Sequence, residues 1–450
     1  MTKRLFGTDG VRGLANHYPM TPEMAMSLGQ AIAYHFKQEK PQNKIIIGKD
    51  TRQSSYMLEQ AIAAGVCSMG SSAVLTGPLP TPAVGFLAKA MRADAGIMIS
   101  ASHNFFQDNG IKFFDQDGYK LSDEIELELE EFIFSKMIQV KRPVGEEIGK
   151  AKRIDDAQGR YIEFVKSTFP KSYTLERLRV VIDCAHGAAY RVAPAILQEL
   201  GASVIAIGIK PNGININSGC GTTDTRLLQE TVIKHKAHVG IALDGDADRV
   251  ILCDEKGVVI DGDKVVAICA QQLMPNGKGI AKKVVGTIMT NMGVENYLRE
   301  KGIELVRTKV GDRYIIERMR EENIILGGEP SGHIIFSQYT TTGDGLLVGL
   351  QVIANMLKLK AKLSELASQI PLYPQVQQNV HVKSKLPIEN FPEISDALSS
   401  LEKRFKDSCR AIVRYSGTEP VLRLMIEGKD KTLIQKELQT LSEIVQRKLA

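Results

Sequence analysis

Three aspartates alternate with small residues in the stretch GIALDGDADRVILCDE, and they are the strongest chemical signal in the chain: Asp244, Asp246 and Asp248. Their carboxylates can converge on one side of a strand end or loop, where three unpaired negative charges would repel one another. A hard divalent cation relieves this repulsion, and ligands that are all oxygen favour Mg²⁺, Mn²⁺ or Ca²⁺ over zinc. A solvated acidic turn is the alternative reading of the same residues.

The same stretch also resembles part of a calcium-binding EF-hand loop, because the three aspartates and Glu255 fall at loop positions 1, 3, 5 and 12. Position 6 of such a loop must be a glycine that makes a sharp turn, and here it is Arg249. The sequence on both sides is typical of strands rather than helices. An EF-hand is therefore rejected.

Ser102, His103 and Asn104 follow the apolar run 95–99, where a strand is expected to end. Proteins of the α/β class place their chemistry at such strand ends. A serine hydrolase is disfavoured, because neighbours in an extended segment point to opposite faces and no GxSxG motif surrounds the serine. A serine that carries a phosphoryl group needs a cation and positive side chains instead. Polar turn filler is the alternative, and the pair Asn109 and Gly110 is expected to form a turn soon after.

Positive side chains are available for such a phosphoryl group. Lys112 follows the serine segment, Arg249 follows the third aspartate, and Arg12 lies in the glycine-rich stretch FGTDGVRG. Each of them taken singly would be read as a surface charge. Together with the serine and the aspartates, they form a candidate site for phosphoryl transfer.

Two further stretches have the composition of ligand-binding loops, although plain turns are the alternative for both. GGEPSGHI, at 327–334, offers donors and acceptors suited to sugar hydroxyls, namely Glu329, Ser331 and His333. RYSGTEP, at 414–420, offers backbone amides, hydroxyls and a guanidinium suited to phosphate. The candidate phosphate ligands in and after this second stretch are Arg414, Ser416, Gly417, Thr418 and Arg423.

A weak threefold repeat would position these groups, since a strand, helix, strand pattern recurs along the chain. Its copies begin at KIIIGKD (44–50), RVVIDCAHGAA (179–189) and VVGTIM (284–289). Each copy has the size of a parallel βαβ unit. After about residue 370 the pattern changes to that of a small antiparallel α+β domain. The expected domains are 1–157, 158–255, 256–369 and 370–450.

Composition excludes several classes of protein. The chain has 450 residues, 43% of them hydrophobic and 24% charged, which is ordinary for a globular protein. A net charge of +5 is too small and too dispersed for a nucleic-acid partner, although it suits small anions. Six cysteines without CxxC spacing favour reduced core thiols. Because no signal peptide and no run of about 20 apolar residues is found, the expected location is the cytoplasm, away from membranes.

Five motifs in this order, FGTDGVRG, ISASHN, DGDADR, GEPSGH and RYSGTEP, resemble the α-D-phosphohexomutase superfamily over essentially the whole chain. The stretch KPNGININSGCGTTD, at 210–224, is similar to bacterial members that act on glucosamine phosphates. The resemblance implies three related mixed α/β domains plus a smaller C-terminal α+β domain around a central cleft. It also implies interconversion of glucosamine 6-phosphate and glucosamine 1-phosphate through a phosphoserine and a 1,6-bisphosphate, on the route to UDP-N-acetylglucosamine and peptidoglycan.

The resemblance further implies a role for each candidate residue. Ser102 would be the phosphoserine, and its phosphate would share Mg²⁺ with Asp244, Asp246 and Asp248. Arg12 and Lys112 would assist phosphoryl and proton transfer, with His103 nearby, and Arg249 would support the metal loop. Glu329 and Ser331 would hold sugar hydroxyls beside His333. The non-reacting phosphate would be held by Arg414, Ser416, Gly417, Thr418 and Arg423. Glucosamine or glucose 1,6-bisphosphate would phosphorylate the resting enzyme.

One departure concerns the serine segment, where the family usually has proline and this chain has Phe105. Proline would fix φ, so its absence bears on the rigidity of the loop. Tyr415 is a second departure and removes no named ligand. Two other functions use the same groups: a metal-dependent phosphatase, in which water takes the phosphoryl group, and a sugar phosphate binder without catalysis. The oligomeric state is left open, with a homodimer as one alternative.

Overall fold

The computed structural model describes residues 5–7, 9–37, 43–136, 142–274, 279–405, 408–415 and 420–449. The chain divides into two compact units, one formed by Met1–Thr287 with Val306–Gln369 and the other by Ile288–Leu305 with Ile370–Ala450. Within the described residues, no helix combines the length and the apolar character that crossing a bilayer requires.

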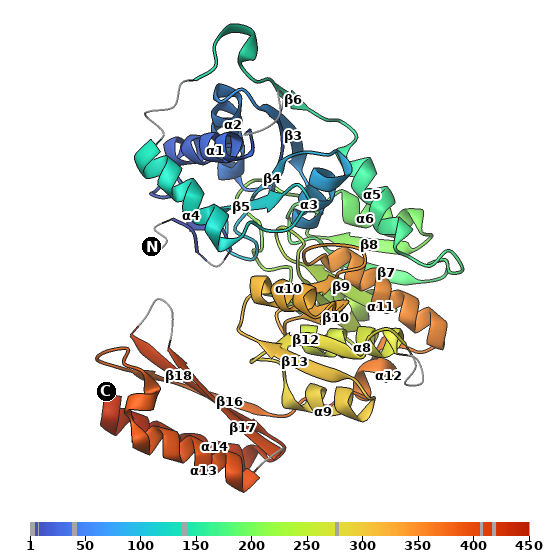
Figure 1. Ribbon diagram of the computed structural model, residues 1–450. Coiled ribbons are helices and arrows are strands. Elements are labelled where there is room, and N and C mark those ends of the chain that lie inside the picture. Colours follow the sequence, from blue (N-terminus) through green and yellow to red (C-terminus); the bar gives the residue numbers. More distant parts are fainter. Residues whose placement is uncertain are drawn as a thin grey trace. The chain divides into compact units, whose positions relative to one another are not determined.

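The first sheet has six strands in the order β1-β5-β4-β2-β3-β6. Strands β3, β4, β5 and β6 of this sheet are labelled in Figure 1. Its strands are β1 Val11–Leu14, β2 Lys44–Lys49, β3 Ser72–Pro78, β4 Ala95–Ile99, β5 Asp108–Asp115 and β6 Ala151–Arg153. The accompanying helices are α1 Pro22–Phe36, α2 Gln53–Ser68, α3 Thr81–Ala90 and α4 Asp123–Glu131. Strand β2 is parallel to β3 and β4, whereas β5 is antiparallel to β4.

Both faces of the central strand β4 are covered. Ile97 lies in one apolar cluster with residues of α1 and α2, while its neighbour Gly96 faces Val84 and Ala88 of α3. A strand buried on both faces is a continuous apolar run, as 95–99 is. This strand therefore has a fixed position, and the residues that follow it start from a rigid support.

The second sheet has five strands in the order β11-β10-β9-β7-β8. Its strands are β7 Arg179–Asp183, β8 Ser203–Ile207, β9 Val239–Leu243, β10 Val250–Asp254 and β11 Val259–Ile260. The helices of this region are α5 Ala157–Ser167, α6 Val192–Glu199 and α7 Arg226–His235. Strands β9 and β10 form an antiparallel pair, and the connection between them, 244–249, holds the three aspartates.

The third sheet has four strands in the order β13-β12-β14-β15. Its strands are β12 Lys283–Thr287, β13 Glu304–Thr308, β14 Leu326–Gly328 and β15 Ile334–Phe336. The helices that follow or connect them are α8 Gly262–Leu273, α9 Met292–Glu300, α10 Asp312–Glu321, α11 Gly345–Leu359 and α12 Leu363–Ser368. Helix α9 lies in the range assigned to the second compact unit.

Helix α11 is tied to α5 by a buried polar contact. The carboxylate of Asp344 accepts a hydrogen bond from the N–H of Leu347 at 3.0 Å and so caps the helix, while the Tyr161 hydroxyl donates to it at 2.9 Å. Burial raises the pKa of Asp344 to about 6 in spite of these donors.

The second unit ends in a three-stranded antiparallel sheet in the order β16-β18-β17. Its strands are β16 Gln375–His381, β17 Cys409–Tyr415 and β18 Val421–Gly428, and its helices are α13 Pro392–Phe405 and α14 Lys431–Leu449. Apolar residues of both helices, among them Ile394, Leu401 and Leu438, pack in one cluster with the sheet residues Leu422 and Leu424.

The predicted fold class, three mixed α/β domains and a smaller C-terminal α+β domain, is confirmed. Each of the three repeats is found as a strand, a helix and a neighbouring strand: β2, α2, β3, then β7, α6, β8, then β12, α9, β13. The predicted turn at Asn109 and Gly110 is wrong, because both residues lie inside β5. The Asn109 amide donates to the hydroxyls of Ser54 and Ser55, so the pair is held by tertiary contacts instead of forming a turn.

Candidate active site

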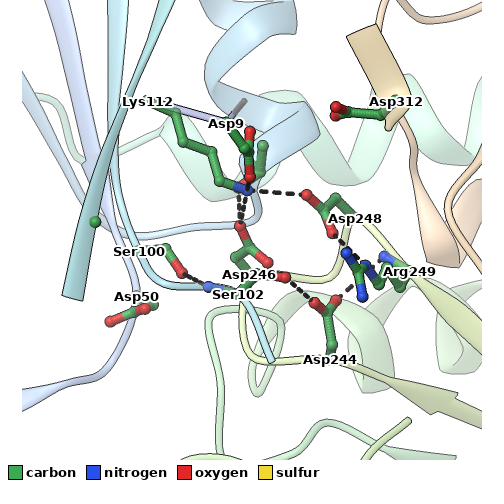
Figure 2. Close-up of polar contacts among 12 residues, drawn as sticks. Asp9, Asp50, Ser100, Ser102, Lys112, Asp244, Asp246, Asp248, Arg249 and Asp312 are labelled. Carbon is green, nitrogen blue, oxygen red and sulfur yellow. Dashed lines mark hydrogen bonds and ion pairs between the residues drawn. The ribbon is translucent and has the colours of Figure 1, made fainter. Parts of the chain in front are cut away.

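Two strand ends of different sheets meet at the candidate site (Figure 2). Ser102 lies just after β4, and its Oγ donates a hydrogen bond to Oδ2 of Asp244, just after β9, at 2.5 Å. The two residues are 142 positions apart in the sequence, and both are buried. The serine and the aspartates therefore come together as the sequence predicted.

A glycine between two of the aspartates makes this approach possible. A Cβ atom on Gly245 would lie 2.6 Å from the carbonyl oxygen of Ser102, which is closer than Cβ atoms approach other atoms. Any larger residue here would push the two loops apart. The small residue that alternates with the aspartates is thus required by the position of the serine.

The three aspartates form a compact buried cluster. One carboxylate oxygen of each lies within 4.8 Å of the others. Oδ1 of Asp246 and Oδ1 of Asp248 are buried and make no hydrogen bond to the described part of the chain. Burial excludes the solvated acidic turn, and the strands on both sides exclude the EF-hand. Buried oxygen donors without partners fit a divalent cation.

The pKa values of Asp244 and Asp246 are shifted in opposite directions. Burial, together with the charges of Asp248 and Asp246, raises the pKa of Asp244 well above its usual range. Burial acts in the same direction on Asp246, but Lys112 and the Thr81 hydroxyl outweigh it, so the pKa of Asp246 is lowered. Arg249 partly opposes the shift of Asp244, the carboxylate that the serine hydroxyl contacts.

Lys112 is the cation at the centre of the site. It lies in β5 with 1% of its surface exposed, and its Nζ is 2.8 Å from Asp246 Oδ2 and 3.0 Å from Asp248 Oδ2. Asp9 is a third partner at 3.4 Å. Burial alone would lower the pKa of Lys112, but these carboxylates raise it well above its usual value. The side chain is therefore charged at neutral pH.

The two predicted arginines and the histidine lie around the same groups. Arg12 forms an ion pair with Asp9, and Arg249 has its Nε 4.0 Å from Asp248 Oδ1 while its backbone N–H donates to Asp244. Burial and the charges of both arginines lower the pKa of His103 to about 4. His103 is therefore a neutral imidazole at neutral pH.

A cavity of about 410 Å³ opens next to these cations. Its walls include Asp9, Arg12, Arg249, Asp312, Glu329 and His333. This volume accommodates a small polar ligand, and the walls combine cations with hydrogen-bond acceptors. The motif FGTDGVRG, the aspartate loop 244–249 and the loops of the third sheet thus contribute walls to one cavity.

The predicted sugar-binding loop connects β14 and β15 on one side of this cavity. Oε1 of Glu329 accepts the N–H of Gly311 at 3.1 Å, and its Oε2 accepts the Ser331 hydroxyl at 3.1 Å. Nε2 of His333 lies 3.5 Å from Asp312 Oδ2. The carboxylate of Glu329 is held in place by these donors and lines the cavity.

The predicted phosphate ligands belong to the second compact unit. Arg414 of β17 and Arg423 of β18 are directly opposite each other in the antiparallel register. Like charges in such a pair repel each other, and an anion between them removes the repulsion. Ser416, Gly417 and Thr418 lie outside the described residues.

Three charged residues and one hydroxyl belong to the site but were not predicted. Lys120 forms ion pairs with both Asp9 and Asp312, and the Thr81 hydroxyl donates to Asp246 at 2.5 Å. Asp9 lies inside the motif FGTDGVRG, so a closer reading of that motif could have found it. Lys120, Asp312 and Thr81 stand outside the quoted motifs, and single residues of these types carry no sequence signal of function.

Family models for phosphoglucomutase/phosphomannomutase match four consecutive parts of the chain. Alpha/beta/alpha domain I matches residues 3–139, domain II matches 159–257, domain III matches 261–373, and the C-terminal domain matches 378–444. The matched regions follow the four sheets in order.

Relatives of known name extend over the full chain. A phosphoglucosamine mutase of Geotalea uraniireducens is 53% identical over 447 residues, which cover 99% of this chain and 98% of the relative. A phosphoglucomutase/phosphomannomutase family protein from Burkholderia thailandensis has a similar solved structure, with a TM-score of 0.80 at 21% identity and coverage of 98% and 97%. The N-acetylphosphoglucosamine mutase of Aspergillus fumigatus, solved with GlcNAc-6P and magnesium, has a TM-score of 0.67 at 16% identity, covering 99% of this chain and 96% of the other.

Proposed function

Because the chain belongs to the phosphoglucomutase/phosphomannomutase family, we propose that Ser102 carries the phosphoryl group in its reaction. The reaction is the interconversion of glucosamine 6-phosphate and glucosamine 1-phosphate through a phosphoserine enzyme and a 1,6-bisphosphate intermediate. Its product supplies UDP-N-acetylglucosamine synthesis. The observation that supports the role of Ser102 is its hydroxyl at 2.5 Å from a carboxylate of the buried aspartate cluster.

The transfer moves one phosphoryl group between two oxygens. The bond from phosphorus to Ser102 Oγ breaks, a bond to the free hydroxyl of the sugar forms, and the proton of that hydroxyl ends on Oγ. The charge that builds on the phosphoryl oxygens is stabilised by the fixed cations Lys112, Arg12 and Arg249. For isomerisation, the bisphosphate then turns end for end and returns its other phosphate to Ser102.

A divalent cation fits the aspartate cluster, and we assign it as Mg²⁺ held by Asp244, Asp246, Asp248 and an oxygen of the serine phosphate. Such an ion would neutralise the carboxylates and polarise the phosphoryl oxygens. Support comes from the two buried carboxylate oxygens without hydrogen bonds and from the all-oxygen donor set. The Aspergillus protein of the same fold was solved with magnesium.

The sugar is proposed to bind in the cavity lined by Arg12, Arg249 and Glu329. Glu329 and Ser331 would accept and donate hydrogen bonds to its hydroxyls, with His333 beside them. Support comes from the position of Glu329 in the cavity wall, where backbone and side-chain donors hold its carboxylate. Glucosamine or glucose 1,6-bisphosphate would supply the phosphoryl group that first phosphorylates Ser102.

Mapping of phosphate on the enzyme tests the role of Ser102. After incubation with glucose 1,6-bisphosphate and Mg²⁺, peptide mass spectrometry is expected to find phosphate on Ser102, and a coupled assay is expected to find isomer without net phosphate release. Net release of inorganic phosphate without isomer would favour a phosphatase. A protein that binds sugar phosphate but never gains phosphate at this position would be a binding protein.

Replacement of Arg414 by alanine tests the proposed site for the non-reacting phosphate. KM is expected to rise about 10- to 100-fold and kcat to fall, because a charged hydrogen bond to the distal phosphate is lost in both orientations of the intermediate. Steady-state kinetics with glucosamine 1-phosphate measures both values. Arg404→Ala is the matched control, because Arg404 is an arginine of the same unit whose side chain is half exposed on α13. If the kinetic constants of the Arg414 variant equal those of the control, the phosphate site lies elsewhere.

A further inference from the structure

We infer that Arg52 and Asn217 are positioning residues that together clamp the loop of Ser102 and aim its hydroxyl at the metal carboxylates. The two residues lie in loops that follow strands of different sheets. Arg52 is in the segment between β2 and α2, and Asn217 is in the segment between β8 and α7. The inference rests on the proposed role of Ser102 as the phosphoryl carrier.

The two side chains donate to the same pair of backbone carbonyls. Nη2 of Arg52 lies 3.1 Å from the carbonyl oxygen of Ser102 and 2.6 Å from that of Asn104. Nδ2 of Asn217 lies 2.9 Å and 2.8 Å from the same two oxygens. Arg52 is fully buried and Asn217 is 2% exposed, so these two donors are shielded from water.

Arg52 is itself held in place by its neighbours. Asp50 forms a buried ion pair with its guanidinium and accepts its backbone N–H at 2.9 Å. The Ser55 hydroxyl donates to the same carboxylate at 2.8 Å. Because a buried guanidinium is costly unless its charge is balanced, Asp50 explains how the arginine is retained there. The planar fork of arginine presents one nitrogen to the acid and the other to the two carbonyls, whereas a lysine has a single nitrogen for all three.

The conformation of the serine explains why a clamp is needed. Ser102 has φ of +51°, in the left-handed region that a serine rarely adopts. Its backbone N–H donates to Ser100 Oγ at 2.9 Å, and its carbonyl is the group that Arg52 and Asn217 hold.

The chain around Arg52 makes further contacts with two loops of the second sheet, the one after β7 and the one after β8. The Thr51 hydroxyl donates to the carbonyl of His186 at 2.5 Å, and the N–H of Gln53 donates to the carbonyl of Gly213 at 2.9 Å. Asn217 and Gly213 both belong to the stretch KPNGININSGCGTTD, for which the proposed function names no role. That stretch therefore supports the serine loop, since it carries one half of the clamp.

The clamp predicts which kinetic constants depend on it. Neither Arg52 nor Asn217 is among the residues that line the cavity in the described chain, so sugar phosphate binding does not depend on them directly. Their loss lets the serine hydroxyl leave its position against Asp244, which slows phosphoryl transfer. The expected signature is a lower kcat with unchanged affinity.

The test uses Asn217→Ala and the isosteric Asn217→Asp, both of which remove the amide donor. Both are expected to lower kcat and the rate of Ser102 phosphorylation by glucose 1,6-bisphosphate about 10- to 100-fold, with the Kd for glucosamine 6-phosphate within about twofold of wild type. Arg52→Lys keeps the charge beside Asp50 but loses the fork, and a similar loss of kcat is expected. Phe105→Ala, in the same loop and 60% exposed, is the control expected to retain wild-type rates.

The outcomes distinguish a failure of the clamp from a failure of the proposed function. Wild-type kcat in both Asn217 variants would overturn the clamp, and so would a loss of kcat in step with a weaker Kd. A wild-type enzyme that never gains phosphate at Ser102 would overturn the proposed function instead. In the double variant Arg52→Lys with Asn217→Ala, the fold-loss of kcat is expected to be smaller than the product of the two single fold-losses, because both side chains act on the same carbonyls.

Discussion

Replacement of Ser102 by alanine is expected to lower kcat at least about 10³-fold, while the enzyme still binds glucosamine 6-phosphate. The hydroxyl is the proposed carrier of the phosphoryl group, and it donates directly to Asp244. The cavity walls formed by Arg12, Glu329 and His333 are unchanged by this substitution. A coupled assay measures kcat, and titration calorimetry with the sugar phosphate measures binding.

Ser100→Ala is the matched control for this variant. Ser100 is a buried serine of the same loop, and its Oγ accepts the backbone N–H of Ser102 at 2.9 Å and Nη1 of Arg52 at 3.4 Å. Loss of these two neutral-acceptor hydrogen bonds is expected to lower kcat by less than about tenfold. Turnover by Ser102→Ala at the level of this control would show that the phosphoryl group travels by another residue.

The elements that hold the site were predictable because residue type and hydrophobic periodicity indicate the same secondary structure in each of them. The β-branched runs at 44–49 and 239–243 form strands that are buried along almost their whole length, and helical periodicity follows the first of them. Short polar connections at the ends of such strands then carry the functional groups. For this reason the sequence predicts Ser102 at a strand end and the three aspartates at a strand end or loop.

The contacts that position those groups were not predictable in the same way. Arg52 and Asn217 act on backbone carbonyls, which every residue has, so no pairing of residue types reveals them. The ion pairs of Lys120 with Asp9 and Asp312 connect residues far apart in the sequence. Contacts of this kind depend on the packing of whole sheets against each other, and a single sequence does not encode that as a local pattern.

The incorrect turn at Asn109 and Gly110 has a related cause. The dipeptide favours a hairpin turn by its backbone preferences, yet here its residues pair with β1 and continue β5. A Cβ on Gly110 would lie 2.6 Å from the carbonyl oxygen of Ser100, so the glycine is needed for close approach to the serine loop. The tertiary requirement of the site thus outweighs the local preference of the two residues.

Replacement of Asp246 by asparagine is expected to lower kcat about 10²- to 10³-fold and to raise the Mg²⁺ concentration for half-maximal activity about 10- to 100-fold. Asp246 has one oxygen bound by Lys112 and the Thr81 hydroxyl and a second buried oxygen without a hydrogen bond, which is the proposed metal ligand. Asparagine keeps the size of the side chain and removes its charge. Rates across a Mg²⁺ titration, after treatment with a chelator, measure both effects.

Asp254→Asn provides the matched comparison, because Asp254 is also a buried carboxylate, at the end of β10, and accepts only the backbone N–H groups of Lys256 and Val258. Asparagine keeps one acceptor oxygen for these donors, so wild-type kcat and Mg²⁺ dependence are expected. If Asp246→Asn lowered kcat without moving the Mg²⁺ titration, its carboxylate would act only by fixing Lys112. The metal would then have to be held by other groups, since a charge lost from its ligand set must weaken its binding.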